Sequence, residues 1–333
     1  MKWLVTGGCG FIGTNLIRHL RARGGESIRV LDNLSVGRAD DLAAVAPVSE
    51  VSAATAEFPA PADGVQLVVG DVTAQEVVLE AARSADVIVH LAANTGVLPS
   101  IEDPRTDCVT NVVGTLNALE AARACGVGAF VFASSGAVLG EQLPPIHEAL
   151  VPKPLSPYGA SKLAGEGYCA VYAACYGITT SALRFGNVYG PGSALKGSVV
   201  AKFVKQALRG ETLVIFGDGA QTRDFIYIDD LVDAVCRAAA SHDGGETFQI
   251  ATSRETTVDE IARTVSELVR EMTGVQVGIE YAEARTGEII RNYADVSKAR
   301  RLLGWSPVRS LADGLRETVR WYVEAQRPTA GPE

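Results

Sequence analysis

Residues 2–32 read KWLVTGGCGFIGTNLIRHLRARGGESIRVLD, and the order of elements in this stretch decides the fold. Lys2–Thr6 predicts a short buried strand, and the glycine motif GGCGFIG follows it directly. Thr14–Arg23 has helical periodicity, and Ser27–Leu31 predicts a second strand that ends at Asp32. A strand, a glycine turn, a helix and a strand closed by an acid form the unit that a dinucleotide-binding fold requires.

The glycines and the acid of this unit each have a physical role in binding a dinucleotide. Gly7 permits the tight turn, Gly10 lets the backbone approach a pyrophosphate, and Gly13 lets the helix pack closely. The pyrophosphate would lie at the helix N-terminus, among free N–H groups. Asp32, 19 positions after Gly13, can accept hydrogen bonds from the adenosine ribose and repels a 2′-phosphate, so it favours NAD over NADP. The alternative is a tight structural turn that binds no ligand.

Strands and helices are expected to alternate through the rest of the first half. The expected strands are Val65–Val69, Val87–Leu91, Ala129–Ala133 and Thr179–Arg184, and the expected helices lie near Ala74–Arg83, Asp107–Cys125 and Tyr158–Tyr176. This alternation predicts an α/β fold of the Rossmann type, with a doubly wound parallel sheet and helices on both faces. Residues 42–64 have little periodicity and predict a surface excursion or short helices.

The second half is less regular and predicts a smaller α/β lobe that binds the substrate. Its expected helices are Lys196–Arg209, Asp229–Ala240, Val258–Thr273 and Leu311–Gln326, and its expected strands are Thr212–Phe216 and Asp224–Ile228. We therefore divide the chain into a nucleotide-binding domain at 1–190, a lobe at 191–326 that can exchange strands with it, and a tail at 327–333. A ligand would lie between the two parts.

Composition excludes several classes of function. The net charge is −9, from 30 basic and 39 acidic residues, so neither nucleic acid nor an anionic membrane is expected as the main partner. The six cysteines form no CxxC pair and no His cluster accompanies them, which predicts reduced thiols in a cytoplasmic protein and no metal site. Met1–Val5 runs directly into the glycine motif, so we expect no signal peptide. No apolar run reaches the ~20 residues that span a bilayer.

A candidate acid–base pair lies in the stretch SPYGASK at 156–162. Tyr158 and Lys162 are four positions apart, and a helix that begins near Pro157 would place both side chains on one face. A neighbouring ammonium group is expected to lower the pKa of a phenol toward the working range of a general base. The alternative is an exposed tyrosine and a solvated lysine on a surface helix. Ser134 and Ser135 are either part of this site or hydroxyl caps of a loop.

The motifs occur in an order that resembles the extended short-chain dehydrogenases/reductases, specifically the NAD-dependent epimerase/dehydratase family that acts on nucleotide sugars. The resemblance covers residues 2–325. The motifs that carry it are GGCGFIG at 7–13, Asp32-Asn33-Leu34-Ser35, Gly70-Asp71-Val72, His90-Leu91-Ala92-Ala93, Ser134-Ser135, YGASK at 158–162 and RFGNVYGP at 184–191.

The resemblance implies a role for each position that matches. Tyr158 would take the proton of a sugar hydroxyl, Lys162 would bind the nicotinamide ribose, and Ser135 would hydrogen-bond the same hydroxyl. Ser134 would lie nearer the nicotinamide. The positions implied to contact NAD, besides Ser134, Tyr158 and Lys162, are Gly7, Gly10, Phe11, Ile12, Gly13, Asp32, Asn33, Ser35, Gly37, Asp71, Val72, Leu91, Ala92, Ala93, Asn111 and Phe185.

Further positions resemble the nucleotide-sugar site of the family. QTRDFIYIDD at 221–230 is similar to a segment whose arginine, here Arg223, grips the substrate diphosphate. The segment that contains Arg285 and Glu288 resembles one that supplies a second arginine to the diphosphate and a carboxylate to the nucleotide ribose. Taken singly, arginines such as Arg223 and Arg285 are more often surface residues that form salt bridges. The other positions implied to contact substrate, besides Ser135 and Tyr158, are Asn187, Val199, Phe216 and Asn292.

Three departures from the family pattern bear on sugar size. Leu139 stands where relatives often have tyrosine, and Gly186 stands where they often have an aromatic residue, so we expect a roomier site. Asn292 falls where glucose-restricted epimerases have a large tyrosine that closes the sugar pocket. The smaller asparagine predicts that enlarged hexoses enter. The alternative is that Asn292 is a loop residue with no sugar contact.

The reaction follows from what stands after Ser135. Dehydratases and decarboxylases of the family carry an acid there, whereas this chain has Gly136, Ala137 and Val138. Members of the family that reduce their substrate overall usually use NADPH, and Asp32 disfavours binding of that cofactor. We therefore predict NAD-dependent 4-epimerisation of a UDP-hexose, namely UDP-glucose/UDP-galactose, UDP-N-acetylglucosamine or UDP-glucuronate, through a 4-keto intermediate. The alternatives are a dehydratase or reductase, or a non-catalytic NAD-binding regulator. By resemblance we also expect a homodimer through the helices near 107–125 and 158–176.

Overall fold

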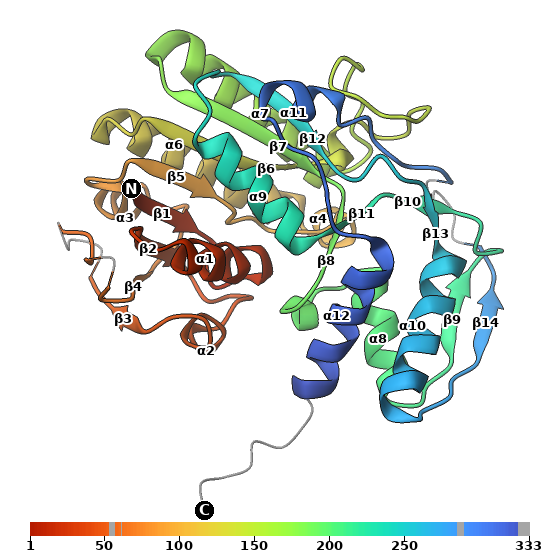
Figure 1. Cartoon of the computed structure of the whole chain (residues 1–333). Helices are drawn as coiled ribbons and strands as arrows, with labels where there is room; N and C mark the ends of the chain where they lie inside the picture. The colour runs from red at the N-terminus through yellow and green to blue at the C-terminus, as the bar shows by residue number, and fades with distance from the viewer. Residues whose placement is uncertain (53–56, 61, 285–289, 326–333) are drawn as a thin grey trace, which may run out of the picture.

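The computed structural model describes residues 1–52, 57–60, 62–284 and 290–325. A large parallel sheet with helices on both faces forms one lobe, and a smaller lobe packs beside it (Figure 1). None of the helices in the described ranges combines the length and the apolar character that a bilayer crossing requires.

The main sheet has eight strands, and every neighbouring pair is parallel. Their order is β12 (Glu246–Ile250), β7 (Thr179–Phe185), β6 (Ala129–Ser135), β5 (Val87–His90), β1 (Lys2–Thr6), β2 (Ser27–Asp32), β4 (Val65–Val69) and β3 (Val48–Glu50). The chain winds outward from β1 in both directions, so the switch point that binds ligands in such sheets lies between β1 and β5. The predicted fold class is confirmed, while β3 and β12 are strands that the sequence pattern did not predict.

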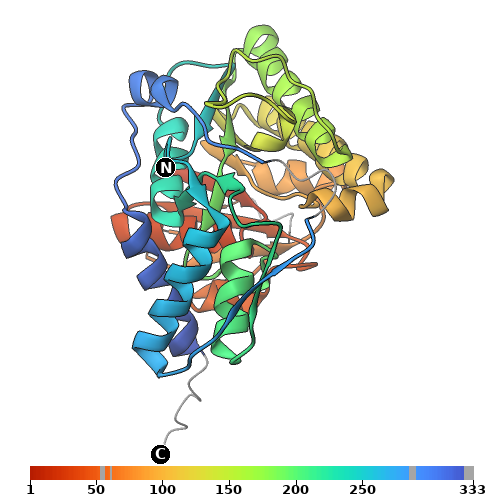
Figure 2. The same ribbon diagram turned by 90° about the vertical axis from the view of Figure 1, so that its right-hand side faces the viewer.

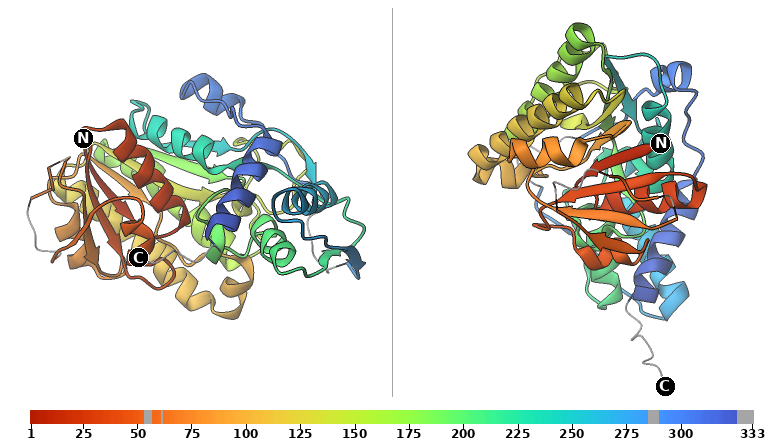
Figure 3. Two further views of the ribbon diagram at one scale, coloured as in Figure 1. Left: turned by 60° about the horizontal axis from the view of Figure 1, so that its bottom comes forward. Right: turned by 90° about the vertical axis from the view of Figure 1, so that its left-hand side faces the viewer.

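Helices cover both faces of the sheet because successive side chains of a strand point to opposite sides. Trp3 and Val5 join the core under α1 (Phe11–Arg23) and α9 (Ile228–Ala239). Leu4 joins the opposite core, under α3, α6 and α7 (Figure 3, right). These three helices span Gln75–Ala82, Gly114–Cys125 and Pro157–Tyr176.

The helix that carries the candidate acid–base pair begins where the sequence predicts. Ser156 is the N-cap of α7, and its hydroxyl accepts a hydrogen bond of 3.1 Å from the N–H of Gly159. Pro157 occupies the first turn, where its missing N–H costs nothing. Gly177, with φ +70°, ends the helix. The single helix expected at 107–125 is instead α5 (Pro104–Cys108), a π-helical turn η1 (Val109–Val113) and α6; α4 (Val97–Glu102) precedes them.

The smaller lobe combines three helices with short strand pairs (Figure 2). The helices α8 (Val199–Leu208), α10 (Val258–Thr273) and α12 (Leu311–Ala325) pack on one another. The strand pairs are β9 (Leu213–Phe216) with β14 (Ile279–Ala282), β8 (Asn187–Tyr189) with β11 (Phe225–Tyr227), and β10 (Thr222–Arg223) with β13 (Thr256–Thr257). The remaining short elements are α2 (Ala39–Ala43), α11 (Ser297–Leu302), η2 (Gly136–Val138) and η3 (Ser193–Leu195).

Several predicted boundaries differ from the structure. The helix expected from Lys196 begins only at Val199, because Ser198 has the extended backbone of an N-cap. The strand expected at 224–228 ends at Tyr227, and Ile228 is already the first residue of α9. Helix α9 and strand β12 pack with the main sheet from beyond residue 190, an exchange that the expected division allowed, and the division itself stays a prediction.

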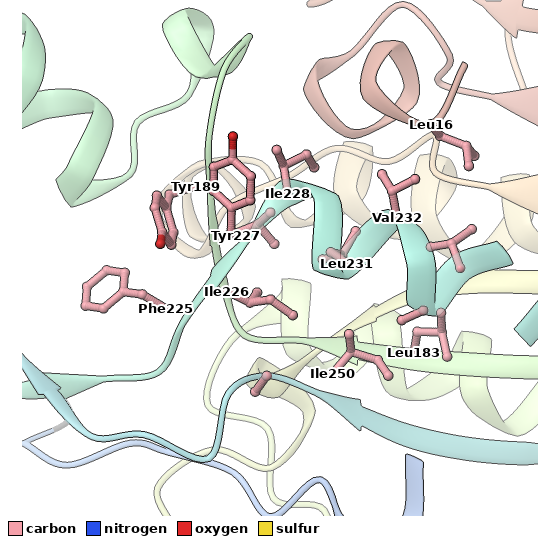
Figure 4. Close-up of a cluster of buried hydrophobic side chains, with 14 of the residues drawn as sticks. Leu16, Leu183, Tyr189, Phe225, Ile226, Tyr227, Ile228, Leu231, Val232 and Ile250 are labelled. Atoms are coloured by element: carbon pink, nitrogen blue, oxygen red, sulfur yellow. The ribbon is translucent and has the colours of Figure 1, made fainter. Parts of the chain in front are cut away.

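A buried aromatic and aliphatic cluster joins the two lobes (Figure 4). Tyr189 of β8 packs against Phe225 and Tyr227 of β11, with ring centroids 6.5 and 5.6 Å apart. Ile228 and Leu231 of α9 continue this cluster toward the main sheet. Each such side chain contributes about 1.5–3 kcal/mol when fully buried, so the strands that lead into the smaller lobe are firmly anchored.

Candidate active site

The glycine motif is shaped by close backbone contacts inside the protein. Gly7 has φ +68°, which favours glycine. A Cβ atom at Gly13 would lie 2.5 Å from Cα of Gly8, and one at Gly37 would lie 2.4 Å from the carbonyl of Cys9. A Cβ atom at Gly10 would instead have only the carbonyl oxygen of Gly7, at 3.3 Å, within 4 Å. The outer side of Gly10 is therefore open for a ligand to approach.

The N-terminus of α1 can receive an anion. Gly10 is its N-cap, and within this described helix no side chain caps the first turn and no acid stands in it. The first N–H groups of a helix have no partner inside the helix, and they point toward the space outside its end. Phe11 and Ile12 are half-buried at this end. The residues present thus fit the pyrophosphate of NAD.

Asp32 is buried at the end of β2 and holds the glycine motif in place. Its Oδ2 accepts a hydrogen bond of 2.9 Å from the N–H of Cys9. Its Oδ1 accepts one of 2.9 Å from the N–H of Leu34, a residue with φ +58°. Each carboxylate oxygen keeps a second acceptor position, so ribose hydroxyls can still bind. The sequence predicted the ribose role and missed the structural one.

Asn33, Ser35 and Asp71, three of the positions implied to contact NAD, form one cluster at the ends of β2 and β4. Asn33 donates to Asp71 Oδ2 at 2.7 Å, and the N–H of Ser35 donates to Asn33 Oδ1 at 3.1 Å. Thr73 donates twice to Asp71 Oδ1, at 2.8 and 2.7 Å. Burial alone would raise the pKa of Asp71, but the hydrogen bonds from Thr73 and Asn33 outweigh it and lower that pKa. Val72, the next residue, is buried in the core.

The HLAA motif lines the switch point of the sheet. The N–H groups of Leu91 and Ala92 donate to the carbonyl and the hydroxyl of Thr6, at 3.1 and 3.3 Å. His90 bonds the same hydroxyl at 2.8 Å, and complete burial lowers the pKa of His90 to about 3, so the ring is neutral. This arrangement leaves Ala92 and Ala93 half-buried beside the glycine motif.

The structure brings Ser135, Tyr158 and Lys162 together. Ser135 is the last residue of β6, and it forms a hydrogen bond with Tyr158 on the first turn of α7. The ammonium of Lys162 lies 5.9 Å from the centre of the Tyr158 ring and 4.9 Å from that of Phe132. Phe185, at the end of β7, pairs with Ser135 in the sheet.

The expected lowering of the Tyr158 pKa is wrong for this structure. Burial of the phenol raises the pKa of Tyr158, the hydrogen bond with Ser135 opposes this rise, and the charge of Asp107 adds to it. Lys162 is itself buried, and desolvation lowers its pKa to about 8, with Asp107 acting in the opposite direction. The spacing that placed the ammonium near the phenol could not show how strongly both groups are desolvated.

A buried ion pair lies directly behind this site. Arg184 of β7 makes two hydrogen bonds to Glu166, from Nε at 2.8 Å and from Nη2 at 2.7 Å. Ser134 donates to the same carboxylate at 2.5 Å. Ser134 thus donates its hydroxyl hydrogen to a protein group, the carboxylate of Glu166. Sequence reasoning missed Glu166, although its position four residues after Lys162 puts it on the same face of α7.

Asn111 is buried, and its amide binds protein groups. It exchanges hydrogen bonds with the backbone of Asn94, at 2.8 and 3.0 Å, and donates to Asp107 at 2.8 Å and to Ser161 at 3.1 Å. Ser161 in turn donates to the carbonyl of Tyr158 at 3.0 Å. Through these bonds the π-helical turn η1 joins the loop after β5 to α7, and the expected contact of Asn111 with the cofactor stays a prediction.

The candidate substrate residues lie on converging segments. Asn187 is exposed at the start of β8, and Arg223 lies in β10. The N–H of Asn292 donates to the Thr222 hydroxyl at 3.4 Å, which places Asn292 beside Thr222, the residue before Arg223. Val199 begins α8 and Phe216 ends β9, with the ammonium of Lys202 5.3 Å from the Phe216 ring. Arg285, Glu288 and the tail lie outside the described residues.

Two of the departures from the family pattern do not widen the site as expected. Leu139 is completely buried in the main core. A Cβ atom at Gly186 would point at the carbonyl of Asp224, 3.0 Å away, and at the side chain of Ala251. Both positions are therefore set by packing inside the protein, and only Asn292 retains a bearing on sugar size.

Comparisons with known proteins agree with this geometry. A family model described as NAD dependent epimerase/dehydratase family matches residues 3–251. A UDP-glucose 4-epimerase from Mycolicibacterium smegmatis is 37% identical over 326 residues, which cover 97% of this chain and 98% of the relative.

Two solved structures show how far the similarity extends. A UDP-glucose 4-epimerase from Thermotoga maritima with UDP-glucose is 34% identical, with a TM-score of 0.86 over 98% of this chain and 100% of that one. A dTDP-glucose 4,6-dehydratase from Streptomyces venezuelae with NAD bound is 32% identical, with a TM-score of 0.84 over 97% of both chains. The similarity thus includes both epimerases and dehydratases.

Proposed function

The chain belongs to the NAD-dependent epimerase/dehydratase family, and we propose that it inverts the C4 configuration of a UDP-hexose through a 4-keto intermediate. The observation that carries this proposal is the cluster of Ser135, Tyr158 and Lys162 with no acid in η2, the turn Gly136–Val138 that follows Ser135. An elimination needs such an acid, whereas inversion at C4 needs only a base and a hydride acceptor.

NAD fits the residues of the described glycine loop, and Gly10, the N-terminus of α1 and Asp32 would hold it. When bound, it supplies the acceptor and then the donor of the C4 hydride.

The chain's own groups move the proton and hold the substrate. Tyr158, as phenolate, takes the proton of the C4 hydroxyl, which Ser135 orients, and Lys162 stabilises the phenolate charge. The 4-keto sugar then turns to present its other face, and Tyr158 returns the proton to the C4 oxygen. Arg223 and Asn187 would keep the diphosphate bound during that rotation, since an arginine fork suits phosphate oxygens.

A product screen tests this function. The NAD-loaded protein is incubated in D₂O with UDP-glucose, UDP-N-acetylglucosamine or UDP-glucuronate, and the products are followed by proton NMR. We expect a C4 epimer that retains hydrogen at C4, because the hydride leaves and returns within one site. A 6-deoxy-4-keto product would show a dehydratase, and bound NAD without turnover of any substrate would favour a regulator.

The pocket-wall role of Asn292 predicts a selective effect of added bulk. Asn292→Tyr should lower turnover of an N-acetylated or carboxylated hexose by about tenfold and leave UDP-glucose nearly unchanged, because a larger side chain excludes the larger substituent. Asn292→Ser is the matched control and should keep both activities. Relative kcat/KM values provide the measurement. An equal loss on all hexoses, or no loss, contradicts the assignment.

We also propose that two copies of the chain associate through α7 and its neighbours. The apolar side chains exposed there are Val109 and Val113 of η1, Tyr168 and Val171 of α7, and Val97, Leu98 and Ile101 of α4. These helices pack on one another, so the exposed side chains lie on adjoining elements. Apolar surface of this kind is typical of protein interfaces.

The association is testable by sedimentation velocity. The unmodified protein should sediment as a dimer, and Val171→Glu should yield monomers because it places a charge in the apolar interface. Val308→Glu is the control, since Val308 is even more exposed but lies elsewhere, before α12. A monomeric unmodified protein, or a dimeric Val171→Glu variant, would count against this interface.

A further inference from the structure

Asp224 is a buried carboxylate with four hydrogen-bond donors around it. It lies between β10 and β11, and its side chain is 3% exposed. Oδ1 accepts from the N–H and the hydroxyl of Thr252, at 2.7 and 2.5 Å. Oδ2 accepts from the N–H groups of Ser253, at 3.0 Å, and Ala294, at 3.2 Å. A buried charge is stable in a protein when its acceptor positions are satisfied in this way.

This one residue contacts the segments that carry Asn187, Arg223 and Asn292. Arg223 precedes Asp224 in the chain. The backbone carbonyl of Asp224 accepts a hydrogen bond of 2.8 Å from the N–H of Asn187. Ala294 is two positions after Asn292. The segment 290–294 also bonds Thr222, whose N–H donates to the carbonyl of Ile290 at 2.8 Å. The buried side chain of Asp224 therefore joins the 290–294 segment to the strand that carries Arg223.

The turn on the other side of Asp224 has an unusual backbone. Ser253 has φ +59°, a conformation that residues other than glycine rarely adopt. Its N–H donates to Asp224, and its hydroxyl accepts a bond of 3.3 Å from the N–H of Val296. Such conformations persist where the surroundings fix them, and they concentrate at functional sites. The contacts of Asp224 therefore hold a conformation that the local chain disfavours.

We propose that Asp224 is a positioning residue for the nucleotide sugar. Its carboxylate fixes the 290–294 segment and the 252–253 turn against β10, so that Arg223, Asn187 and Asn292 face one ligand. The inference rests on the proposed function and deepens it. Strand β12, which leads into the 252–253 turn, is one edge of the main sheet, and β2 and β4 lie toward the other edge. We therefore expect the role of Asp224 to concern the substrate and the affinity for NAD to stay unchanged.

The test compares Asp224→Asn with a matched control, Asp230→Asn. Asp230 is 5% exposed and also accepts two backbone N–H groups, from Val308 at 3.1 Å and Arg309 at 3.0 Å. An asparagine accepts at only one side-chain atom, so Asp224→Asn loses the bonds of one oxygen. The two donors to Asp230 both bind Oδ2, so Asp230→Asn can keep them and controls for the loss of a buried carboxylate charge. UDP binding and NAD binding are measured by calorimetry, KM and kcat with the UDP-hexose that turns over, and Tm by thermal unfolding.

We expect Asp224→Asn to raise the Kd for UDP and the KM by about tenfold or more, the size expected when a buried group loses its partner. Affinity for NAD should stay unchanged and kcat should change much less than KM. Asp230→Asn should leave KM unchanged, because Asp230 binds the N–H groups of Val308 and Arg309, away from the segments of Arg223, Asn187 and Asn292. If Asp224→Asn does not fold, Thr252→Val carries the same test, because it removes one donor to Oδ1, and KM should rise at least about threefold.

The outcomes separate this role from the proposed function. Unchanged UDP affinity and KM in a folded Asp224→Asn variant, or in Thr252→Val where that variant replaces it, would overturn the positioning role while epimerisation stands. An equal rise of KM in Asp224→Asn and Asp230→Asn would overturn it too, since general destabilisation would then explain both. Unmodified protein that binds neither UDP nor a UDP-hexose would overturn the proposed function and the positioning role together.

Discussion

Tyr158→Phe should lower the rate of epimerisation by ~10²-fold or more, which is the range lost with a general base. The variant keeps the ring and removes only the hydroxyl, which bonds Ser135 at the surface of the site. Folding and NAD binding should therefore persist. The measurements are kcat on the NAD-loaded variant, its Tm and its affinity for NAD. Near-normal turnover in a folded variant would contradict the assigned role.

The pH dependence of the unmodified protein belongs to the same test. Tyr158 acts as phenolate, and burial raises the pKa of Tyr158, so activity should increase as pH rises. Lys162 acts as ammonium, which is present below its pKa of about 8. Its stabilisation of the Tyr158 phenolate should therefore weaken above that pH. The profile of kcat/KM should accordingly rise with pH and then fall on the alkaline side. A profile of kcat/KM with neither a rise nor an alkaline fall would argue against the roles of Tyr158 and Lys162.

The sequence predicted most accurately what depends on neighbours along the chain. The glycine motif, the strand that ends at Asp32 and the N-cap of α7 are local patterns, and the structure has them where the spacing indicates. Strand β12 escaped prediction because its sequence, ETFQI, has no apolar run and its polar–apolar alternation is only four residues long. It becomes a strand by pairing with β7, a contact that no local pattern encodes.

The parts of the site that could not be predicted depend on which strands become neighbours. Ser134 and Arg184 lie side by side only because β6 and β7 pair in that register, and Glu166 reaches both from α7. The rise in the pKa of Tyr158 has the same origin, because desolvation depends on everything packed around the phenol. Residue types and spacing identified the reacting groups, whereas their electrostatics and their supports are tertiary properties.

The buried ion pair between Glu166 and Arg184 should therefore have a large effect on stability. Both side chains are almost completely buried, at 6% and 4% exposure, and their charged atoms are 2.7 Å apart. Among the described residues, Nη1 of Arg184 already has no hydrogen-bond partner. Glu166→Ala would leave the whole guanidinium uncompensated, and it should lower the free energy of unfolding by about 3–5 kcal/mol. Urea unfolding, followed by circular dichroism, measures this loss.

Two further variants show that burial, and not the presence of an ion pair, sets the size of this effect. Glu246→Ala removes an equally short pair, 2.6 Å from Lys298, but its side chains are 38% and 22% exposed, so it should cost at most about 1 kcal/mol. The double variant Glu166→Gln, Arg184→Met removes both charges together and should recover much of the loss, because no buried charge is then left without a partner. If Glu166→Ala and Glu246→Ala lower the free energy of unfolding equally, the buried pair contributes no more than a surface contact. The hydrogen bond from Ser134 to Glu166 would then add no stability either. A large loss in Glu166→Ala that the double variant relieves would identify the unpaired Arg184 charge as its cause.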